Sequence, residues 1–237
     1  MVSWPRNPPR DGLPLGLATA GTYLGQTEET ASQYLDAYEH YWHELNETVE
    51  ELLEYEDRTL FSTWNLSLIQ VRAGNLEAAE ILRLLPYFGS QGVIFELLRA
   101  GRDSGFLWLF SLTANKPEFD RAMARQTSFL LVEVAPEGFH LHACVHDWTL
   151  QALNREIYLP YFQLAIHCVA SNVMSVSERD YWQTNQRLIQ HLIRLEHSRL
   201  RILLDTEDVK DTCFDDLHFW GELYRSHDKL WEAEQMY

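Results

Sequence analysis

The densest group of reactive side chains is the run HLHACVHD, from His140 to Asp147. Alternate residues of an extended strand share a face, so His140, His142 and Cys144 would point to one side. Imidazole and thiolate are zinc ligands, and His146 or Asp147 could supply a fourth. However, no distant Cys-x-x-Cys or His-x-x-x-His pair completes the set, and Cys144 falls where the strand should turn into a helix. The alternative to a zinc site is that His140 is a surface residue of the strand and Cys144 a small buried hydrophobic residue. We prefer this alternative and expect no metal site.

Other catalytic arrangements lack their defining residues. The 237 residues contain no Gly-x-Ser-x-Gly elbow for a nucleophilic serine. They also contain no Gly-x-x-x-x-Gly-Lys-Ser/Thr loop, whose backbone would hold a triphosphate. Phosphoryl transfer without that loop and a magnesium-binding acid lacks both positioning and charge neutralisation. We therefore expect no enzyme activity and no hydrolysis of nucleotide by this chain alone.

The composition limits the possible partners. Nineteen basic residues against 35 acidic ones give a formal net charge of −16, which disfavours nucleic acid and anionic membrane surfaces. No apolar run approaches the ~20 residues that span a bilayer, and the N-terminus lacks an apolar signal core. Three widely spaced cysteines suit a reducing compartment, so we expect a cytoplasmic protein.

The acidic residues are concentrated in one segment. Eleven of them lie between Glu28 and Asp57, where there is no Lys or Arg. A solvated helix face and loop is the preferred interpretation, and a docking site for a basic partner is the alternative.

The spacing of apolar residues predicts mainly helices. Gly12-Leu13-Pro14-Leu15 begins the first one, because proline is tolerated in a first helical turn. Further helices are expected over about 31–45 and in three or four segments between residues 58 and 126. A β-hairpin is predicted from the alternation of side chains over Ser128–Val134, turn residues at 136–138 and a second strand from Phe139. A helix over Val145–Leu153 is expected to follow it. Helices with such a hairpin make a winged helix.

The C-terminal part is again helical, and its end has a repeat pattern. Gly221, Tyr224, Ala233 and Tyr237 have the spacing of a tetratricopeptide repeat, in which small residues let two helices approach closely. The predicted fold is mainly α: a helical subdomain and a winged helix with a small two-stranded wing, then a helical linker and an incomplete tetratricopeptide unit. The expected segments are an irregular arm (1–11), the helical subdomain (12–57), the winged helix (58–155), the linker (156–207) and the truncated repeat (208–237).

Three features in this order resemble the C-terminal half of an NB-ARC nucleotide switch followed by tetratricopeptide repeats, as in fungal NOD-like (STAND) proteins. They are Gly12-Leu13-Pro14-Leu15, the segment from Leu141 to Asp147 that closes the winged helix, and the repeat start. Tyr55–Trp64 (YEDRTLFSTW) and Val145–Trp148 (VHDW) also resemble the fungal winged-helix segment. The resemblance covers nearly everything from Gly12 onward.

The resemblance implies a regulatory and interaction role in nucleotide-switched signalling, of the innate-immunity or self/non-self type. In the family, the proline of Gly-Leu-Pro-Leu lies against the adenine of the nucleotide. The resemblance gives this role to Pro14. The histidine of the family's Met-His-Asp motif reaches the β-phosphate of ADP. The resemblance gives this role to His142. Leu141 replaces the motif's Met and Ala143 its Asp. The P-loop segments would precede Gly12, so no cofactor is expected in this chain, although ADP or ATP binds the intact family.

The implied partners are the absent nucleotide-binding domain and proteins bound through the tetratricopeptide region. Two other classes of function compete with this one. A generic helical protein-binding scaffold would not depend on nucleotide. A winged-helix nucleic-acid binder would need a basic recognition helix, but the segment from Phe119 carries only Arg121 and Arg125.

Overall fold

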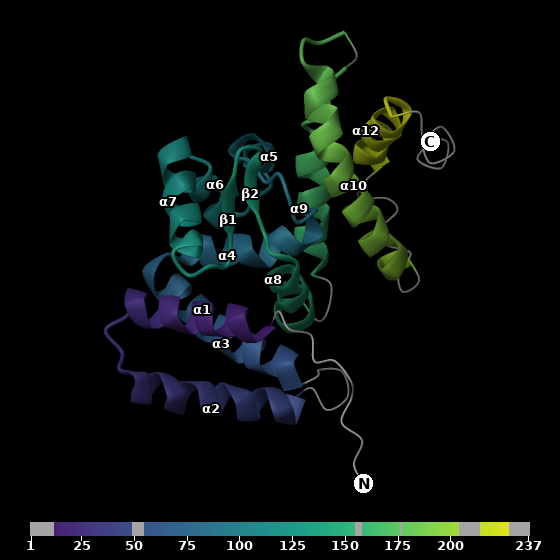
Figure 1. Ribbon diagram of the computed structural model, residues 1–237. Coiled ribbons are helices and arrows are strands. Elements are labelled where there is room, and N and C mark those ends of the chain that lie inside the picture. The colour runs from purple at the N-terminus through teal and green to yellow at the C-terminus, as the bar shows by residue number, and fades with distance from the viewer. Residues whose placement is uncertain (1–11, 49–54, 155–157, 176, 204–213, 228–237) are drawn as a thin grey trace.

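The computed structural model describes residues 12–48, 55–154, 158–175, 177–203 and 214–227 (Figure 1). The expected N-terminal arm (1–11) lies outside the described residues, as do residues 208–213 and 228–237 of the expected truncated repeat (208–237). The described part is mainly helical with one two-stranded antiparallel sheet, which confirms the predicted fold class.

The first three helices form one layer. Helix α3 (Tyr55–Gly74) packs against both α1 (Gly12–Gln26) and α2 (Ala31–Thr48), so the boundary expected between residues 57 and 58 falls inside a helix. The contacts are close and partly polar. Gly16 is buried, and a side-chain carbon there would lie 3.4 Å from Leu60 Cδ2. Tyr34 of α2 is hydrogen-bonded to Thr63 of α3, with 3.1 Å between the hydroxyl oxygens.

The central region contains the remaining helices before the hairpin. Their bounds are α4 (Leu76–Leu84), the 3₁₀ turn η1 (Leu85–Tyr87), α5 (Phe95–Arg99), α6 (Leu107–Leu112) and α7 (Lys116–Thr127). The amide side chains of Asn75 and Asn115 accept backbone N–H groups at the N-termini of α4 and α7, which fixes where these helices begin. Pro86 lies inside η1, where α4 stops.

The hairpin follows α7. Strands β1 (Glu133–Ala135) and β2 (Gly138–His140) pair with Ala135 opposite Gly138. Val93 forms an additional antiparallel bridge with Phe139 on the other edge of β2. The short helix α8 (Ala143–Trp148) and a π-helical turn η2 (Thr149–Leu153) complete the region. This is the element order that the sequence predicts for a winged helix.

The expected strand over Ser128–Val134 is mostly wrong. Only its end belongs to β1, and residues 128–132 form turns and bends, with Leu130 in the left-handed region at φ 55°. Phe129, Leu131 and Val132 are buried, whereas Leu130 and Val134 are exposed. The alternation therefore does not reflect one extended strand. Helix α6 was not predicted either, because its six residues are too short to show a helical period.

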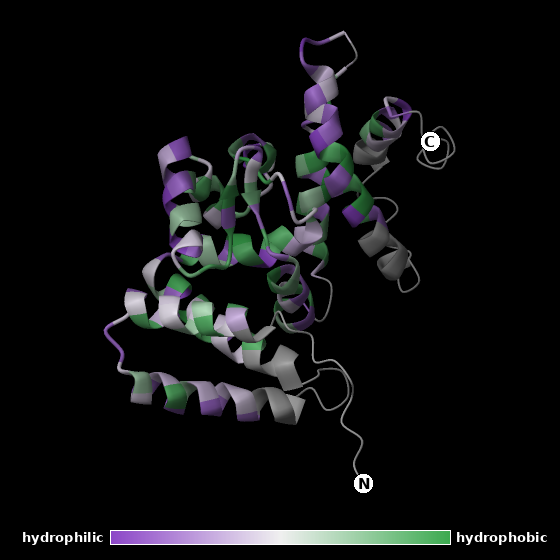
Figure 2. Cartoon of the chain, in the orientation of Figure 1, coloured by the Kyte–Doolittle hydropathy of each residue, from purple (hydrophilic) through white to green (hydrophobic). Residues whose placement is uncertain are grey.

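The last helices pack onto the central region. They are α9 (Leu159–Ala170), α10 (Tyr181–Leu203) and α12 (Phe214–Arg225). Eight of the twelve residues of α9 are buried, so this part of the segment expected as a linker (156–207) belongs to the core. Gly101, which follows α5, allows this contact, because a Cβ there would lie 2.6 Å from Cys168 Sγ. Figure 2 shows the hydrophobic residues gathered along α4 and α9 and the hydrophilic ones toward the N-terminal end of α10. None of the helices in the described ranges is long and apolar enough to cross a membrane.

Candidate functional site

His142 lies on the surface at the point where β2 leads into α8. It is the N-cap residue of α8, and its Nδ1 accepts a hydrogen bond from the backbone N–H of Cys144 at 3.3 Å. The preceding Leu141 is buried, which anchors the chain while the imidazole of His142 stays exposed. His142 is therefore available to a group outside its own region.

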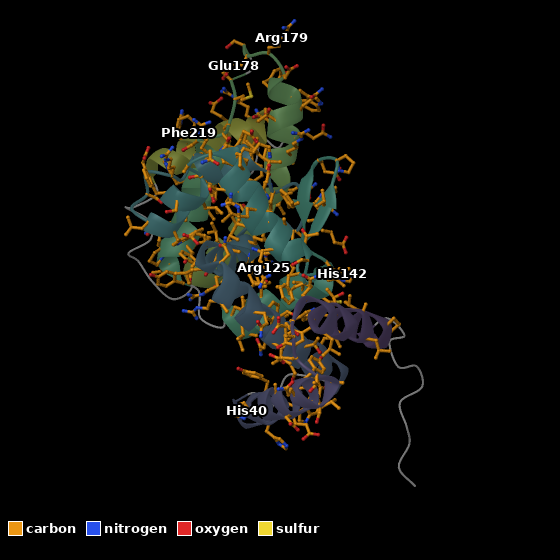
Figure 3. All side chains as sticks on the ribbon, turned by 90° about the vertical axis from the view of Figure 1, so that its left-hand side faces the viewer. His40, Arg125, His142, Glu178, Arg179 and Phe219 are labelled. Carbon is orange, nitrogen blue, oxygen red and sulfur yellow. The ribbon has the colours of Figure 1, made fainter. Side chains whose placement is uncertain are left out.

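Pro14 is also exposed, in the first turn of α1. Figures 1 and 3 both show α8, with His142 at its start, lying beside α1. Helix α3 provides the common support, because α1 packs on it and Trp64 of α3 meets Trp148 of α8 with ring centroids 5.7 Å apart. Both tryptophans are fully buried, so α3 and α8 are held firmly relative to each other.

The hypothetical metal ligands do not come together. Because the chain turns into α8 at Ala143, His142 and Cys144 do not continue the strand face of His140. His140 Nε2 lies 3.4 Å from Glu137 Oε1 across the hairpin turn. His140 and Cys144 are both half-buried, so neither matches the expected surface or buried position. Within the described ranges, no three His, Cys, Asp or Glu side chains are placed to hold a metal ion.

His146, one turn further along α8, points inward. Its Nε2 lies 3.4 Å from the carbonyl oxygen of Phe88. Burial lowers the pKa of His146, and the positive charge of Arg194 lowers it further. Hydrogen bonds to the carbonyls of Phe88 and Pro86, and the nearby charge of Asp147, oppose these effects. The ring is therefore kept neutral at neutral pH.

His146 contacts a segment that we call the junction loop, Pro86–Val93. This loop is hydrogen-bonded to residues that precede and follow His142 in the sequence. The backbone N–H of Leu141 donates to the carbonyl of Ser90 at 2.7 Å, and Val93 and Phe139 exchange two backbone hydrogen bonds at 2.8 and 3.1 Å. The segment that carries His142 is thus attached to the junction loop before and after the histidine.

Helix α10 holds the other side of the junction loop. His191 Nδ1 accepts from the backbone N–H of Gly89 at 3.1 Å, and the ring is also hydrogen-bonded to the backbone of Gly92. Its ring meets that of Phe88 edge-on, with centroids 5.6 Å apart. Arg194 Nε donates to the carbonyl of Pro86 at 3.3 Å. Burial lowers the pKa of His191 to about 4, although the bond to Gly92 opposes this effect, so the ring is neutral.

The sequence interpretation missed His191 and the junction loop. One signal was present: His191 is a single imidazole among Leu188, Ile189, Leu192 and Leu195, which are the buried residues of an amphipathic helix. A polar ring on such a face needs hydrogen-bond partners. Which backbone groups supply them depends on the tertiary fold, since Gly89 and His191 are 102 residues apart.

The helix that would read DNA is α7, and its three cations are engaged. Lys116 Nζ lies 2.9 Å from Asp120 Oδ1, and Arg121 Nη1 lies 2.6 Å from Glu118 Oε2. Arg125 Nη2 donates to the carbonyl of Gln70 at 3.1 Å, which ties α7 to the end of α3. This surface therefore offers little uncompensated positive charge to phosphates.

Comparison of the chain with family models, with curated proteins and with solved structures gave no match.

Proposed function

We propose that this chain is the regulatory half of a nucleotide-switched signalling protein of the NOD-like (STAND) class. In this proposal, α1–α3 form the helical subdomain, α4–η2 form the winged helix, and α12 begins a tetratricopeptide array. The chain binds and regulates and has no catalytic role. Its ligand-facing residues are Pro14 and His142, which would contact ADP held by a P-loop domain outside these residues.

The observation that carries the proposal is the exposed imidazole of His142 beside α1. A histidine that only filled the core would be buried like His146 or His191. An imidazole at this position can donate a hydrogen bond to a diphosphate oxygen, which suits a reversible latch. Helix α3 supports both neighbours of this surface, because α1 packs on it and Trp64 of α3 contacts Trp148 of α8.

The proposal predicts weak nucleotide binding by the 237 residues alone. Pro14 and His142 would supply contacts to a nucleotide, but no P-loop is present to position its phosphates. We expect titration calorimetry with ADP or ATP to give no measurable heat at micromolar concentrations. A dissociation constant in the low micromolar range would contradict the proposal.

A second experiment tests the role of His142 in the intact protein. In a chain that includes the P-loop domain, His142→Ala should speed ADP release by roughly ten- to a hundredfold, since a hydrogen bond to a charged group contributes about 1.5–3 kcal/mol. His40→Ala is the matched control, because His40 is exposed on α2 (Figure 3). Equal ADP release rates in the two variants would exclude His142 as the latch.

A generic scaffold is the simpler alternative, in which α10 and α12 bind a protein whatever the nucleotide state. The two hypotheses differ in one measurement. The switch requires that a partner's affinity for the intact protein changes between its ADP and ATP forms, because a ligand shifts a conformational equilibrium only by its differential affinity. Equal affinities in both forms would favour the scaffold.

A further inference from the structure

The junction loop connects two parts of the chain that the proposed function requires to communicate. On one side it runs along the segment that carries His142. The hydrogen bonds of Phe139, Leu141 and His146 to Val93, Ser90 and Phe88 lie in sequence along that segment. Any displacement of the loop that keeps these bonds must carry His142 with it.

On the other side, the junction loop lies directly against the backbone of α10. A Cβ at Gly89 would be 3.1 Å from the carbonyl oxygen of Gln190, so only glycine allows this approach without movement of the helix. Gly92 has φ 73°, a conformation that favours glycine, and it turns the loop toward His191. His191 is 1% exposed, so its ring nitrogens have no alternative partner in water.

Helix α10 continues this connection to the beginning of the proposed repeats. The hydroxyl of Tyr224 on α12 donates to the carboxylate of Glu196 on α10. Trp220, Leu223 and Tyr224 of α12 are buried, and α12 contacts both α9 and α10. A force on α12 is therefore applied to α10, two turns or less from the residues that hold the junction loop.

We propose that the junction loop transmits movements of α10 and α12 to His142, and that His191 is the positioning residue that couples the loop to α10. The inference rests on the proposed function for its meaning, because only a switch needs the repeats to act on His142. If α10 moved away alone, the buried ring of His191 would lose its hydrogen bonds to Gly89 and Gly92. That cost makes movement of the loop together with α10 the preferred response.

Hydrogen exchange on the full 237-residue chain tests this coupling without any nucleotide. His191→Leu removes both ring bonds while keeping an apolar side chain of similar size. We expect the backbone amide of Leu141, which donates to Ser90, to exchange roughly tenfold faster than in the wild type, measured relative to the amides of α7. His191→Asn retains an oxygen that can accept from Gly89, so it should restore part of the protection. His40→Leu is the control and should leave Leu141 unchanged.

The contrary result is equally specific. If His191→Leu speeds exchange at Gly89 but leaves Leu141 at the wild-type rate, α10 holds the loop without coupling it to the His142 segment, and the inference is wrong. Should His191→Leu fail to fold, Gly89→Ala provides the same test, because its methyl group must push α10 and the loop apart by a few tenths of an ångström. Unchanged exchange at Leu141 in that variant would also overturn the coupling.

The two proposals fail in different measurements. Loss of coupling appears in amide exchange of the isolated chain, where no nucleotide is involved. Loss of the switch itself appears as an ADP release rate that His142→Ala does not alter. A positive exchange result with a negative release result would leave a coupled helical scaffold.

Discussion

His146 and His191 bind the same loop from opposite sides. His146 Nε2 of α8 lies 3.4 Å from the carbonyl oxygen of Phe88, and His191 Nδ1 of α10 lies 3.1 Å from the next residue's nitrogen, that of Gly89. Both rings are buried, and burial lowers both pKa values. The interface between the hairpin region and α10 is thus built on two neutral imidazoles, and it should weaken when they are protonated.

The first prediction concerns pH. The pKa of His191 is about 4 in the folded chain and near 6.5 when unfolded, so the unfolded state binds a proton first as the pH falls. The contribution of His191 to the free energy of unfolding is therefore complete above about pH 6.5 and decreases between about pH 6.5 and 4. It levels off below that range. The total loss is on the order of 3 kcal/mol, and His146 adds to it in the same direction.

Urea denaturation at several pH values measures this effect as a difference between proteins. The wild type should lose more stability than His191→Leu between pH 7 and 4, because the variant lacks the titrating ring, whereas the carboxylates titrate in both. Parallel curves for the two proteins would show that His191 is not held neutral by its surroundings.

The second prediction concerns Gly101, where the turn after α5 meets α9. Gly101→Ala would place a methyl carbon 2.6 Å from both Cys168 Sγ and Leu164 Cδ1, so the packed helix must shift. Overpacking of this kind should lower the free energy of unfolding by about 1–3 kcal/mol. Gly21→Ala in α1 is the matched control, because no atom lies within 4 Å of the added carbon. It should stabilise the chain by about 0.5–1 kcal/mol, and denaturant midpoints that rank the two variants in the reverse order would contradict this packing.

Helix positions were predictable wherever local rules were sufficient. The stripe of Leu188, Leu192 and Leu195 is buried as expected, and α4 stops near Pro86 because proline cannot continue the helix. The hairpin turn at residues 136–138 was also predictable from its turn chemistry, because Gly138 adopts φ 133° there.

Long-range contacts were not predictable. The sequence predicts a strand at Phe129, Leu131 and Val132. In the structure these residues lie in turns and bends, and their side chains are buried in the core. The exposure of His142 and the burial of His146 also could not be read locally, since both are histidines four residues apart. The difference arises because His146 faces the junction loop, more than 50 residues earlier in the chain. Pairings at such separations leave no periodic trace in one sequence.

The third prediction uses this contrast. His142→Ala should change the free energy of unfolding by less than about 1 kcal/mol, because it removes only an exposed N-cap acceptor at 3.3 Å. His146→Ala should cost about 2–3 kcal/mol, because it opens a cavity and leaves the carbonyl of Phe88 without this partner. Thermal and urea unfolding of both variants check the difference. Equal, large losses would mean that His142 has a structural role and would weaken its assignment as a ligand-facing residue.

The last prediction concerns nucleic acid. Two of the three cations of α7 are paired with acids on the same helix, Lys116 with Asp120 and Arg121 with Glu118. We therefore expect fluorescence anisotropy with duplex DNA at about 150 mM salt to show no binding, since non-specific binding depends on neutralised phosphates. The double variant Glu118→Gln, Asp120→Asn should acquire weak binding that disappears as salt rises, because it frees both cations without changing the fold. Sequence-dependent binding by the wild-type chain at this salt concentration would instead support a DNA-reading winged helix. Contacts to phosphates do not distinguish sequences, so such binding would require contacts to the bases.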